Sequence, residues 1–398
     1  MLLLDLNGFK RVNDIHGHGI GDQILTVVAR RLRAAVREGD LVARLGGDEF
    51  AILAHHLIGA EAATTIARHV LHVLEDPIAT ASTTHQVGAG IGIALVPRDA
   101  NTLQEALRKA DVALYRAKGE RRSALRFFEE EMDHCVRERD QLERELHIAV
   151  AKDLVRPSYQ PLVDLKTGKV VGFEAIPRWV HPLFGEILPD RFLPIAEDTG
   201  LVHALARQLL RRACAAAVRW PADVILAMDI FPGQLRDASL QETVLSILTE
   251  SGLASDRLEL EITEAALVRD LDGAQEILGS LRQAGVRIAL DNFGTGYSSL
   301  YHLRNFKLDK IKIDRSFITS LLVERESSAI VRALVGLGHG LGLTVIAEGV
   351  EGPEQQTSLL MTGCEQGQGC FFGAPILEED TLTLVGNRTP GEMSVARI

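Results

Sequence analysis

The sequence contains few cysteines and no long apolar run. Disulfide scaffolds and zinc sites use dense or closely paired cysteines, whereas this chain of 398 residues scatters only four. No apolar run approaches the roughly 18 residues of a membrane-spanning helix, and the start MLLLDL is too short for a signal peptide. We therefore expect a soluble protein of the reducing cytoplasm, without a membrane segment. The cysteines are Cys135, Cys214, Cys364 and Cys370.

Basic residues are too few for a protein that binds nucleic acid polymers. Lys and Arg number 43 against 54 Asp and Glu, which gives a formal net charge of -11. Binding to DNA or RNA depends on a basic surface that faces the phosphates, so we expect no such partner. The length predicts two or three domains, and 46% hydrophobic residues are enough to give each one a core.

The first third of the chain has the pattern of an α+β domain. The segments LVARL and EFAIL lie on either side of GGD, like the two strands of a β-hairpin. The order of the remaining segments predicts helices packed on an antiparallel sheet. We expect strands at 1–6, 86–96 and 124–128, and helices from after the first strand to Arg37, at 60–75 and at 102–118.

The rest of the chain predicts a connecting helix and then a barrel. Residues 129–152 are rich in charge, with apolar residues loosely at helical spacing, which predicts a helix with one apolar stripe or a solvated spacer. Eight short apolar segments then alternate with helical ones, which predicts a (β/α)8 barrel. We place the domains at 1–128 and 153–390. The expected barrel strands are SYQPLVDL, KVVGFEAI, DVILAMDI, RLELEIT, VRIALD, LDKIKID, LTVIAE and CEQGQGCFF.

Polar residues occur at the ends of these barrel strands. One such acid alone would be read as a helix N-cap or a solvated turn residue, but a barrel gathers all of its strand ends at one mouth. Several carboxylates in a partly dry site repel one another unless cations lie among them. Oxygen ligands without His or Cys favour Mg²⁺ or Mn²⁺, and two such ions can cleave a phosphodiester. The residues are Glu174, Asp229, Glu261, Asp291, Asn292, Lys312, Glu348 and Gln368.

Six motifs between about residues 155 and 386 resemble those of EAL-domain cyclic di-GMP phosphodiesterases. They are FEAIPRW, LELEITE, DNFGTGYSSL, KIDRSF, AEGVE and QGQGCFFGAP. The resemblance implies hydrolysis of one phosphodiester bond of cyclic di-GMP, which gives the linear dinucleotide. It implies metal ligands at Glu174 and Glu261 for one ion, Asp291 between two ions and Glu348 at the second. It further implies that Lys312 and Gln368 position the water, Glu264 anchors the loop after Asp291, and Arg178 contacts a substrate phosphate.

Several positions depart from the pattern of that family. Glu-Ala-Ile replaces Glu-Ala-Leu, a change between apolar side chains of similar volume from which we expect little effect. Cys370 and Phe231 replace an expected Tyr and Ser and should alter the pocket. Asp229 replaces a metal-binding Asn, whereas Asn292 replaces the second Asp of a pair. We expect the first metal to bind more tightly and the second more weakly, with hydrolysis surviving at a reduced rate or with an altered metal demand.

The first 128 residues resemble the GGDEF diguanylate cyclase domain. LDLNGFKRVNDIHGHGIGD and RLGGDEFAIL carry the resemblance. Even without it, Asp5 at a strand end and Asp48 and Glu49 at a hairpin could meet around a metal, or could simply be solvated. The resemblance implies Mg²⁺ ligands at Asp5 and Asp48, and a Glu49 that helps to activate a GTP hydroxyl. It also implies guanine contacts from Asn13 and Asp22, and phosphate contacts from Lys10, Lys118 and Arg122.

Two further features bear on the activity of this first domain. Arg37 and Asp40 occupy the place of a product-inhibition motif, which favours an allosteric cyclic di-GMP site over an ordinary surface ion pair. The family's usual N-terminal helix and its Leu-Thr-Gly-Leu segment are missing from the sequence, so we expect a late start or a truncated domain with weak cyclase activity. Cyclisation needs two domains face to face, each with one GTP, so we expect a homodimer.

Three functions are consistent with the sequence. The first is a cyclic di-GMP phosphodiesterase whose GGDEF half binds GTP or product as a regulator. The second is a bifunctional enzyme that also makes cyclic di-GMP from two GTP molecules. The third is a receptor that binds cyclic di-GMP without turning it over.

Overall fold

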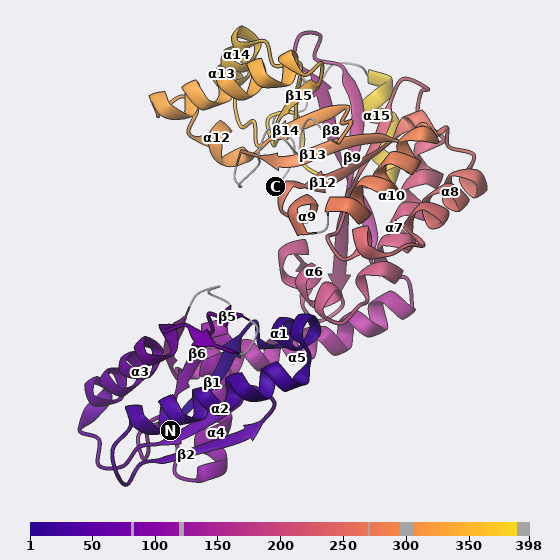
Figure 1. The fold of residues 1–398 in the computed structure, drawn as a ribbon. Helices are drawn as coiled ribbons and strands as arrows, with labels where there is room; N and C mark the ends of the chain where they lie inside the picture. Colours follow the sequence, from indigo (N-terminus) through magenta and orange to yellow (C-terminus); the bar gives the residue numbers. More distant parts are fainter. Residues whose placement is uncertain (81–82, 119–122, 270, 295–305, 388–398) are drawn as a thin grey trace. The chain divides into compact units, whose positions relative to one another are not determined.

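The computed structural model describes residues 1–80, 83–118, 123–269, 271–294 and 306–387. The chain divides into two units, Met1–Gln141 and Leu142–Ile398 (Figure 1). Among the described helices, none is both long enough and apolar enough to cross a membrane.

The first unit is built on a five-stranded sheet with the order β2-β3-β1-β6-β7. The central strand β1 is antiparallel to both of its neighbours, whereas β6 and β7 are parallel. The strands are β1 (Leu2–Asn7), β2 (Leu41–Gly46), β3 (Glu49–Leu53), β6 (Gly88–Ile93) and β7 (Ala124–Phe127), and a small separate hairpin pairs β4 (Ile78–Ala79) with β5 (Thr84–His85). The helices are α1 (Phe9–His16), α2 (His18–Ala35), α3 (Gly59–Glu75) and α4 (Leu103–Lys118).

The alternation of side chains along β1 explains why helices cover both faces of the sheet. Leu2 and Leu4 belong to a buried cluster with residues of α2 and α3, whereas Leu3 belongs to a second cluster with residues of α4. Helix α4 approaches β6 very closely, because a Cβ atom at Gly92 would lie 1.9 Å from the Ala110 carbonyl oxygen. The predicted α+β class is therefore confirmed.

Two details of the predicted first unit are wrong. The sheet is not wholly antiparallel, because α4 carries the chain across between β6 and β7 and leaves these two strands parallel. The expected single helix up to Arg37 is divided at Gly17, whose φ of 81° lies in the left-handed region and interrupts the helix between α1 and α2.

The second unit contains a closed barrel of eight strands. Each neighbouring pair is parallel, except that β8 is antiparallel to both β9 and β16. A short strand, β10 (Gly185–Ile187), extends β9 outside the barrel. In ring order the barrel strands are β8 (Arg156–Asp164), β9 (Val170–His181), β11 (Ile225–Ile230), β12 (Leu258–Thr263), β13 (Arg287–Phe293), β14 (Lys310–Ile313), β15 (Thr344–Ala347) and β16 (Gln366–Gly367).

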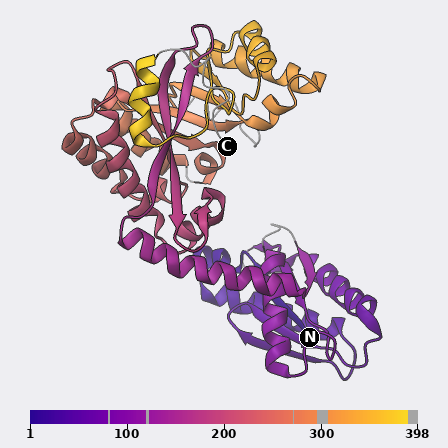
Figure 2. The same cartoon turned by 180° about the vertical axis from the view of Figure 1, so that it is seen from behind.

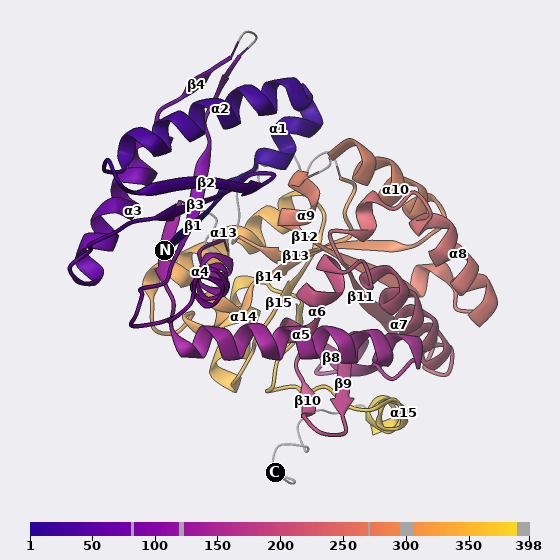
Figure 3. The same ribbon diagram turned by 90° about the horizontal axis from the view of Figure 1, so that it is seen from below.

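Helices surround these strands, and Figure 3 shows α7, α8 and α10 outside β11, β12 and β13. Figure 2 shows the C-terminal helix α15 beside β8, where the Trp220 ring N–H donates a buried hydrogen bond to Thr381 Oγ at 2.9 Å. The helices are α6 (Pro189–Asp198), α7 (Val202–Ala217), α8 (Leu240–Ser251), α9 (Glu264–Arg269), α10 (Leu271–Gln283), α12 (Arg315–Thr319), α13 (Arg325–Gly340), α14 (Pro353–Thr362) and α15 (Glu378–Asn387), with short 3₁₀ turns η1 (Gln234–Arg236) and η2 (Ser255–Arg257).

The predicted barrel is confirmed, but the strict alternation of strand and helix is wrong at its first step. Strand β8 leads directly into β9 through a tight turn in which Gly168 has a φ of 69°. A hairpin connection makes two strands antiparallel, whereas parallel strands need a longer crossover. The seven remaining strands run the same way, so their C-terminal ends still meet at one mouth.

The charged segment between the expected domains forms one helix, α5 (Glu130–Ala151). Apolar residues near both of its ends pack against a core, although Ile148 is exposed. Met132 and Val136 lie against a core of the first unit. Leu142 and Leu146 are buried in the core of the second unit. The alternative of a solvated spacer is therefore wrong.

Two glycines of α13 provide a test of the packing around the barrel. A Cβ atom at Gly338 would lie 2.5 Å from Val345 and 3.0 Å from Ile311, both buried, whereas one at Gly336 meets nothing within 4 Å. We expect Gly338→Ala to lower the free energy of unfolding by about 1–3 kcal/mol through overpacking. The matched Gly336→Ala should raise it by about 0.5–1 kcal/mol through helix propensity. Urea denaturation measures both, and equal effects of the two substitutions would contradict the packing of α13 described here.

Candidate functional site

Seven polar residues meet at the C-terminal mouth of the barrel. The parallel strands place them there, because equivalent positions of neighbouring strands lie side by side, as Asp229 and Glu261 do. The structure thus brings together the residues that the sequence assigns to strand ends. They are Glu174 of β9, Asp229 of β11, Glu261 of β12, Asp291 of β13, Lys312 of β14, Glu348 directly after β15 and Gln368 directly after β16.

Lys312 lies at the centre of this group and has only 1% of its surface exposed. Its Nζ atom is 2.9 Å from Glu174 Oε2 and 2.5 Å from Glu261 Oε2. The same atom is 2.6 Å from Glu348 Oε1 and 3.9 Å from Asp291 Oδ1. We call Lys312 together with Glu174, Asp229, Glu261, Asp291 and Glu348 the carboxylate–lysine cluster.

Burial and mutual repulsion shift the pKa values of this cluster in different directions. Burial raises the pKa of Asp229 well above its usual range, and the neighbouring Glu174 and Asp291 add to the shift. Burial likewise raises the pKa of Glu261 and takes that of Glu348 to about 7, even though Lys312 opposes both shifts. A raised pKa means that each carboxylate lacks enough nearby positive charge to stay ionised easily.

The pKa values of two residues of the cluster shift in the direction that favours the charged form. Burial alone would raise the pKa of Glu174, but attraction to Lys312 and hydrogen bonds from Lys312 and Gln368 outweigh it and lower that pKa. Burial alone would lower the pKa of Lys312, but the surrounding carboxylates, Glu174 first, raise it well above the usual value. One ammonium therefore neutralises several carboxylates only in part, and the negative charge that is left attracts further cations.

The cluster has oxygen atoms available for a metal ion. Glu174, Asp229 and Glu261 each offer a carboxylate oxygen, and these three atoms lie within 4.8 Å of one another. Glu261 Oε1 and Asp291 Oδ1 are buried and have no hydrogen-bond partner among the described residues. Buried oxygens of this kind are costly unless a cation or donor satisfies them, so the donor set fits a hard divalent ion.

Asn292 lies beside the cluster with a backbone conformation that is rare for its type. Its φ of 54° is in the left-handed region, which Asn and Asp tolerate better than other non-glycine residues. Its Nδ2 atom donates a hydrogen bond of 2.7 Å to Asp291 Oδ2. The amide thereby orients Asp291 from one side.

Gln368 and Gln160 form a polar pair next to Glu174. Gln368 Nε2 lies 2.7 Å from Glu174 Oε2 and 3.1 Å from Gln160 Oε1. Gln160 is not among the residues predicted from the sequence, although a glutamine in the middle of the apolar strand SYQPLVDL is a recognisable signal. Its Nε2 atom donates to the Gly373 carbonyl oxygen at 3.4 Å, which ties β8 to the chain after β16.

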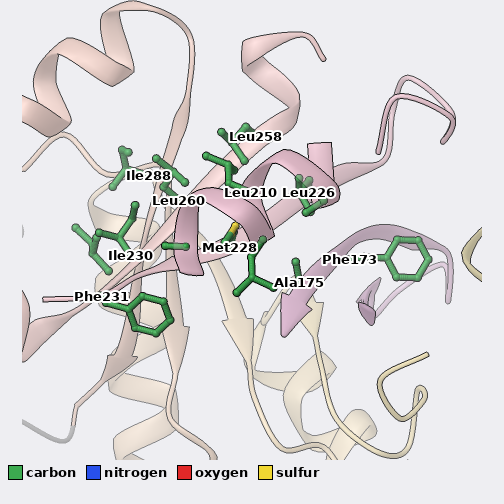
Figure 4. Packing of buried hydrophobic residues seen from close by; sticks show 14 of the residues in the cluster. Phe173, Ala175, Leu210, Leu226, Met228, Ile230, Phe231, Leu258, Leu260 and Ile288 are labelled. Atoms are coloured by element: carbon green, nitrogen blue, oxygen red, sulfur yellow. The ribbon is translucent and has the colours of Figure 1, made fainter. Parts of the chain in front are cut away.

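Four other barrel residues that the sequence singles out are not members of the cluster. Glu264, at the start of α9, is 5% exposed, and both of its oxygens lack a partner in the described part of the chain. The loop that it is expected to anchor lies within 295–305, outside the described residues. Arg178 forms an ion pair with Glu186, with Nε 2.8 Å from Oε1. Phe231 is buried with Met228 and Ile230, as Figure 4 shows, whereas Cys370 is exposed.

A second acidic group lies where the inner strands β1 and β3 of the first unit's sheet meet, at the C-terminal part of β1. Asp5 of β1 is directly opposite Glu49 of β3 in the antiparallel register, and Asp48 precedes Glu49 in the hairpin turn. Gly47 gives this turn its φ of 51°. Lys118 Nζ lies 2.7 Å from Asp5 Oδ2, yet burial raises the pKa of Asp5 more than Lys118 lowers it. The structure thus places Asp5, Glu49 and Lys118 together.

The other expected nucleotide contacts of the first unit are described in part. Asn13 Oδ1 is buried without a partner among the described residues, and a Cβ atom at Gly21 would lie 2.0 Å from it. Asp22 is exposed on α2. Arg122 and the side chain of Lys10 lie outside the described residues.

Arg37 and Asp40 do not form a side-chain ion pair in the described structure. Asp40 is 5% exposed, and its two carboxylate oxygens accept backbone hydrogen bonds from Arg37 at 3.1 Å and from His55 at 3.0 Å. The Arg37 side chain is exposed. The surface ion pair considered as an alternative is therefore wrong, and Asp40 serves to hold the entry into β2.

Two family models match the chain. The EAL domain model covers residues 143–375, and the diguanylate cyclase GGDEF domain model covers residues 1–124. Among the solved structures, the chain is similar to a complex named PaMucR phosphodiesterase with c-di-GMP, at 39% identity and a TM-score of 0.59 over 61% of this chain and 100% of that one. It is also similar to the EAL domain of Mycobacterium smegmatis DcpA, at 34% identity and a TM-score of 0.51 over 59% and 99%.

Curated relatives match over nearly the whole chain. An uncharacterized signaling protein of Caulobacter vibrioides is 42% identical over 96% of this chain and 48% of its own length. The bifunctional diguanylate cyclase/cyclic di-GMP phosphodiesterase MucR of Pseudomonas aeruginosa is 40% identical over 97% and 57%. The cyclic di-GMP phosphodiesterase NbdA of the same species is 37% identical over 94% and 48%. The chain spans about half the length of these relatives.

Replacement of the buried Lys312 by an uncharged residue should destabilise the second unit. We expect Lys312→Met to lower the free energy of unfolding of the metal-free protein by about 3 kcal/mol at neutral pH, because it leaves several buried carboxylates uncompensated. Mn²⁺ should then stabilise the variant more than the parent, because the ion replaces the lost ammonium.

The exposed Lys307, close by in sequence, provides the matched control, since Lys307→Met removes a charge from the surface and not from the cluster. Thermal unfolding with and without Mn²⁺ measures both variants. Equal melting temperatures for the parent and Lys312→Met would show that Lys312 does not balance the cluster.

Proposed function

The chain belongs to the family of proteins with GGDEF and EAL domains, and from this premise we propose that its second unit hydrolyses cyclic di-GMP to the linear dinucleotide. The observation that carries the proposal is the carboxylate–lysine cluster at the barrel mouth. The proposal is supported by the relatives MucR and NbdA, both described as cyclic di-GMP phosphodiesterases, and by the c-di-GMP complex of the MucR phosphodiesterase.

EAL domains depend on metal ions, and we propose Mg²⁺ or Mn²⁺ here because the available ligands are oxygen atoms. Glu174, Asp229 and Glu261 would hold one ion. Asp291 would lie between the two ions, with Glu348 and the Asn292 amide oxygen at the second. When bound, such ions activate a water molecule and stabilise the charge on the leaving oxygen of a phosphodiester.

The protein's own groups would orient the reactants around these ions. Lys312 and Gln368 both contact Glu174, so a water molecule held by them would lie next to that carboxylate. Arg178 would exchange its partner Glu186 for a substrate phosphate, which suits a planar guanidinium with several donors. Glu264 would hold the loop that follows Asp291. Each of these roles remains a proposal.

For the first unit we propose a regulatory role in which it binds GTP or cyclic di-GMP. Asp5 and Asp48 would hold a metal, while Lys118 would move from Asp5 to a phosphate. The contacts to guanine would come from Asn13 and Asp22, and those to phosphates from Lys10 and Arg122. Arg37 would contact the cyclic product. Asp40 is poorly placed to contact the cyclic product together with Arg37, because both of its carboxylate oxygens already accept backbone hydrogen bonds.

A bifunctional enzyme is the second candidate, since MucR carries that description and Asp5 lies opposite Glu49. Synthesis would require two GTP-loaded chains and hence the expected homodimer. A receptor that binds cyclic di-GMP without turnover is the third candidate. The expected cytoplasmic location stays a prediction.

The substitutions at positions 229 and 292 lead to a prediction for the metal demand of hydrolysis. We expect Asn292→Asp to lower the Mn²⁺ concentration for half-maximal hydrolysis roughly tenfold, because affinity for hard cations follows the charge of the ligands. Asp tolerates the left-handed backbone at this position, so the fold should persist. Chromatography of cyclic di-GMP and its linear product measures the rate.

Asp229→Asn and the double variant are the matched controls, since the double variant keeps the formal charge of the parent. Absence of turnover in the parent and in every variant, with cyclic di-GMP still bound, would favour the receptor. An Asn292→Asp variant that gains nothing would contradict the proposed second metal site.

The roles of the two units can be separated with GTP as substrate. We expect the parent to form little cyclic di-GMP from GTP. Glu261→Gln should abolish the hydrolysis of cyclic di-GMP, because a proposed metal ligand is lost. If the chain is bifunctional, Glu261→Gln accumulates cyclic di-GMP from GTP, and additional Glu49→Gln prevents it. Nucleotide analysis after incubation with Mg²⁺ distinguishes these outcomes.

A further inference from the structure

A cavity of about 310 Å³ lies where α7 and α8 pack on the strands β11 and β12, and Asp229 of the carboxylate–lysine cluster is among its lining residues. This volume is at the lower end of the range for small-molecule sites, about 300–1,000 Å³. Of the residues that line it, Asp229 alone has a role among those proposed above.

The floor of the cavity is apolar. It is formed by side chains from the facing sides of α7 and α8 and from the outward side of the two strands, and Figure 4 labels four of them, Leu210, Met228, Ile230 and Leu260. Ala206 and Val244 complete it. A floor of this composition favours an alkyl chain or a ring over a fully polar molecule.

The rim of the cavity is polar, and its charges are unequally matched. Asp237 already has partners, because Ser239 donates to it from Oγ at 2.7 Å and from its backbone N–H at 2.9 Å. His203 Nδ1 lies 3.3 Å from the other oxygen of Asp237. Arg207, one turn after His203 on α7, forms no ion pair or hydrogen bond within the described part of the chain. Among the rim residues His203, Arg207 and Asp237, the unmatched charge is therefore positive, whereas Asp229 lines the cavity from β11.

We propose that this cavity binds a small amphipathic anion, whose carboxylate or similar head group pairs with Arg207 and whose apolar body lies on the floor. The size of the cavity and the apolar floor determine the body of the ligand, and the unmatched guanidinium determines the sign of its head group. A medium-chain carboxylate satisfies both conditions.

The site shares strand β11 with the carboxylate–lysine cluster. Met228, Asp229 and Ile230 of this strand all line the cavity, and Asp229 is at the same time a member of the cluster. A ligand that displaces the side chains of the cavity floor would therefore also shift Asp229. This part of the inference rests on the metal site proposed above, whereas binding to the cavity does not.

Calorimetric titration with octanoate tests the binding. We expect octanoate to bind the parent and octylammonium, with the same chain and the opposite charge, to bind more weakly. Arg207→Gln should weaken octanoate binding about two- to fivefold, as expected for a partly solvated ion pair. Ala204→Phe, which adds a ring at the cavity wall, should abolish binding.

Arg211→Gln is the matched control. Arg211 lies one turn further along α7, outside the cavity, and pairs with Glu250 at 3.3 Å. Its substitution should leave octanoate binding unchanged. No binding to the parent, equal binding of octylammonium, or equal losses in the Arg207 and Arg211 variants would overturn the proposal.

The Mn²⁺ dissociation constant, measured by calorimetry with and without saturating octanoate, tests the link to the cluster. Energetic coupling between two sites changes affinity by about fivefold or more in typical cases. We expect such a change in the parent and its absence in Ala204→Phe. Binding of octanoate with an unaltered Mn²⁺ affinity would overturn the regulatory part.

Discussion

One buried ammonium surrounded by five carboxylates determines the chemistry of the second unit. With every group ionised, Lys312 and its five acids carry a formal charge of −4, which two divalent cations balance. Without those ions the repulsion must be relieved by protons, which is why burial and neighbouring charge raise the pKa values of Asp229, Glu261, Asp291 and Glu348. This chain has Asp229 where the family pattern has Asn, and Asn292 where it has Asp, so the total charge is preserved. In the proposed metal site, one negative charge would thereby move toward the first ion.

The barrel supplies the rigidity that such a cluster needs. Asp229, Glu261 and Lys312 each lie on a hydrogen-bonded strand, so their backbone positions are fixed by neighbours on both sides. Strand β8 closes the ring in the opposite direction and contributes Gln160, which contacts Gln368 from the barrel wall. A buried lysine is tolerated here because excellent geometry repays its desolvation, as the contacts of 2.5 to 2.9 Å indicate.

Much of this arrangement could be predicted from the sequence, and the exceptions share a physical cause. The strand-end positions of Asp291 and Glu348 followed from apolar segments that stop at a polar residue. Glu174 instead lies within β9, which continues to His181. The direction of β8 and the parallel pairing of β6 with β7 depend on which strands become neighbours, and local patterns do not contain that information. The same holds for Asp40, whose spacing fits a ligand site but whose oxygens accept backbone hydrogen bonds in the folded chain.

Anomalous diffraction from crystals grown with Mn²⁺ tests the central claim most directly, because it locates the ions without relying on activity. The account predicts two ions at the barrel mouth. The stronger peak should be bounded by Glu174, Asp229 and Glu261, and the weaker one should lie between Asp291 and Glu348. A cluster that excludes Mn²⁺ at saturating concentration, with Lys312 still among the carboxylates, would contradict it.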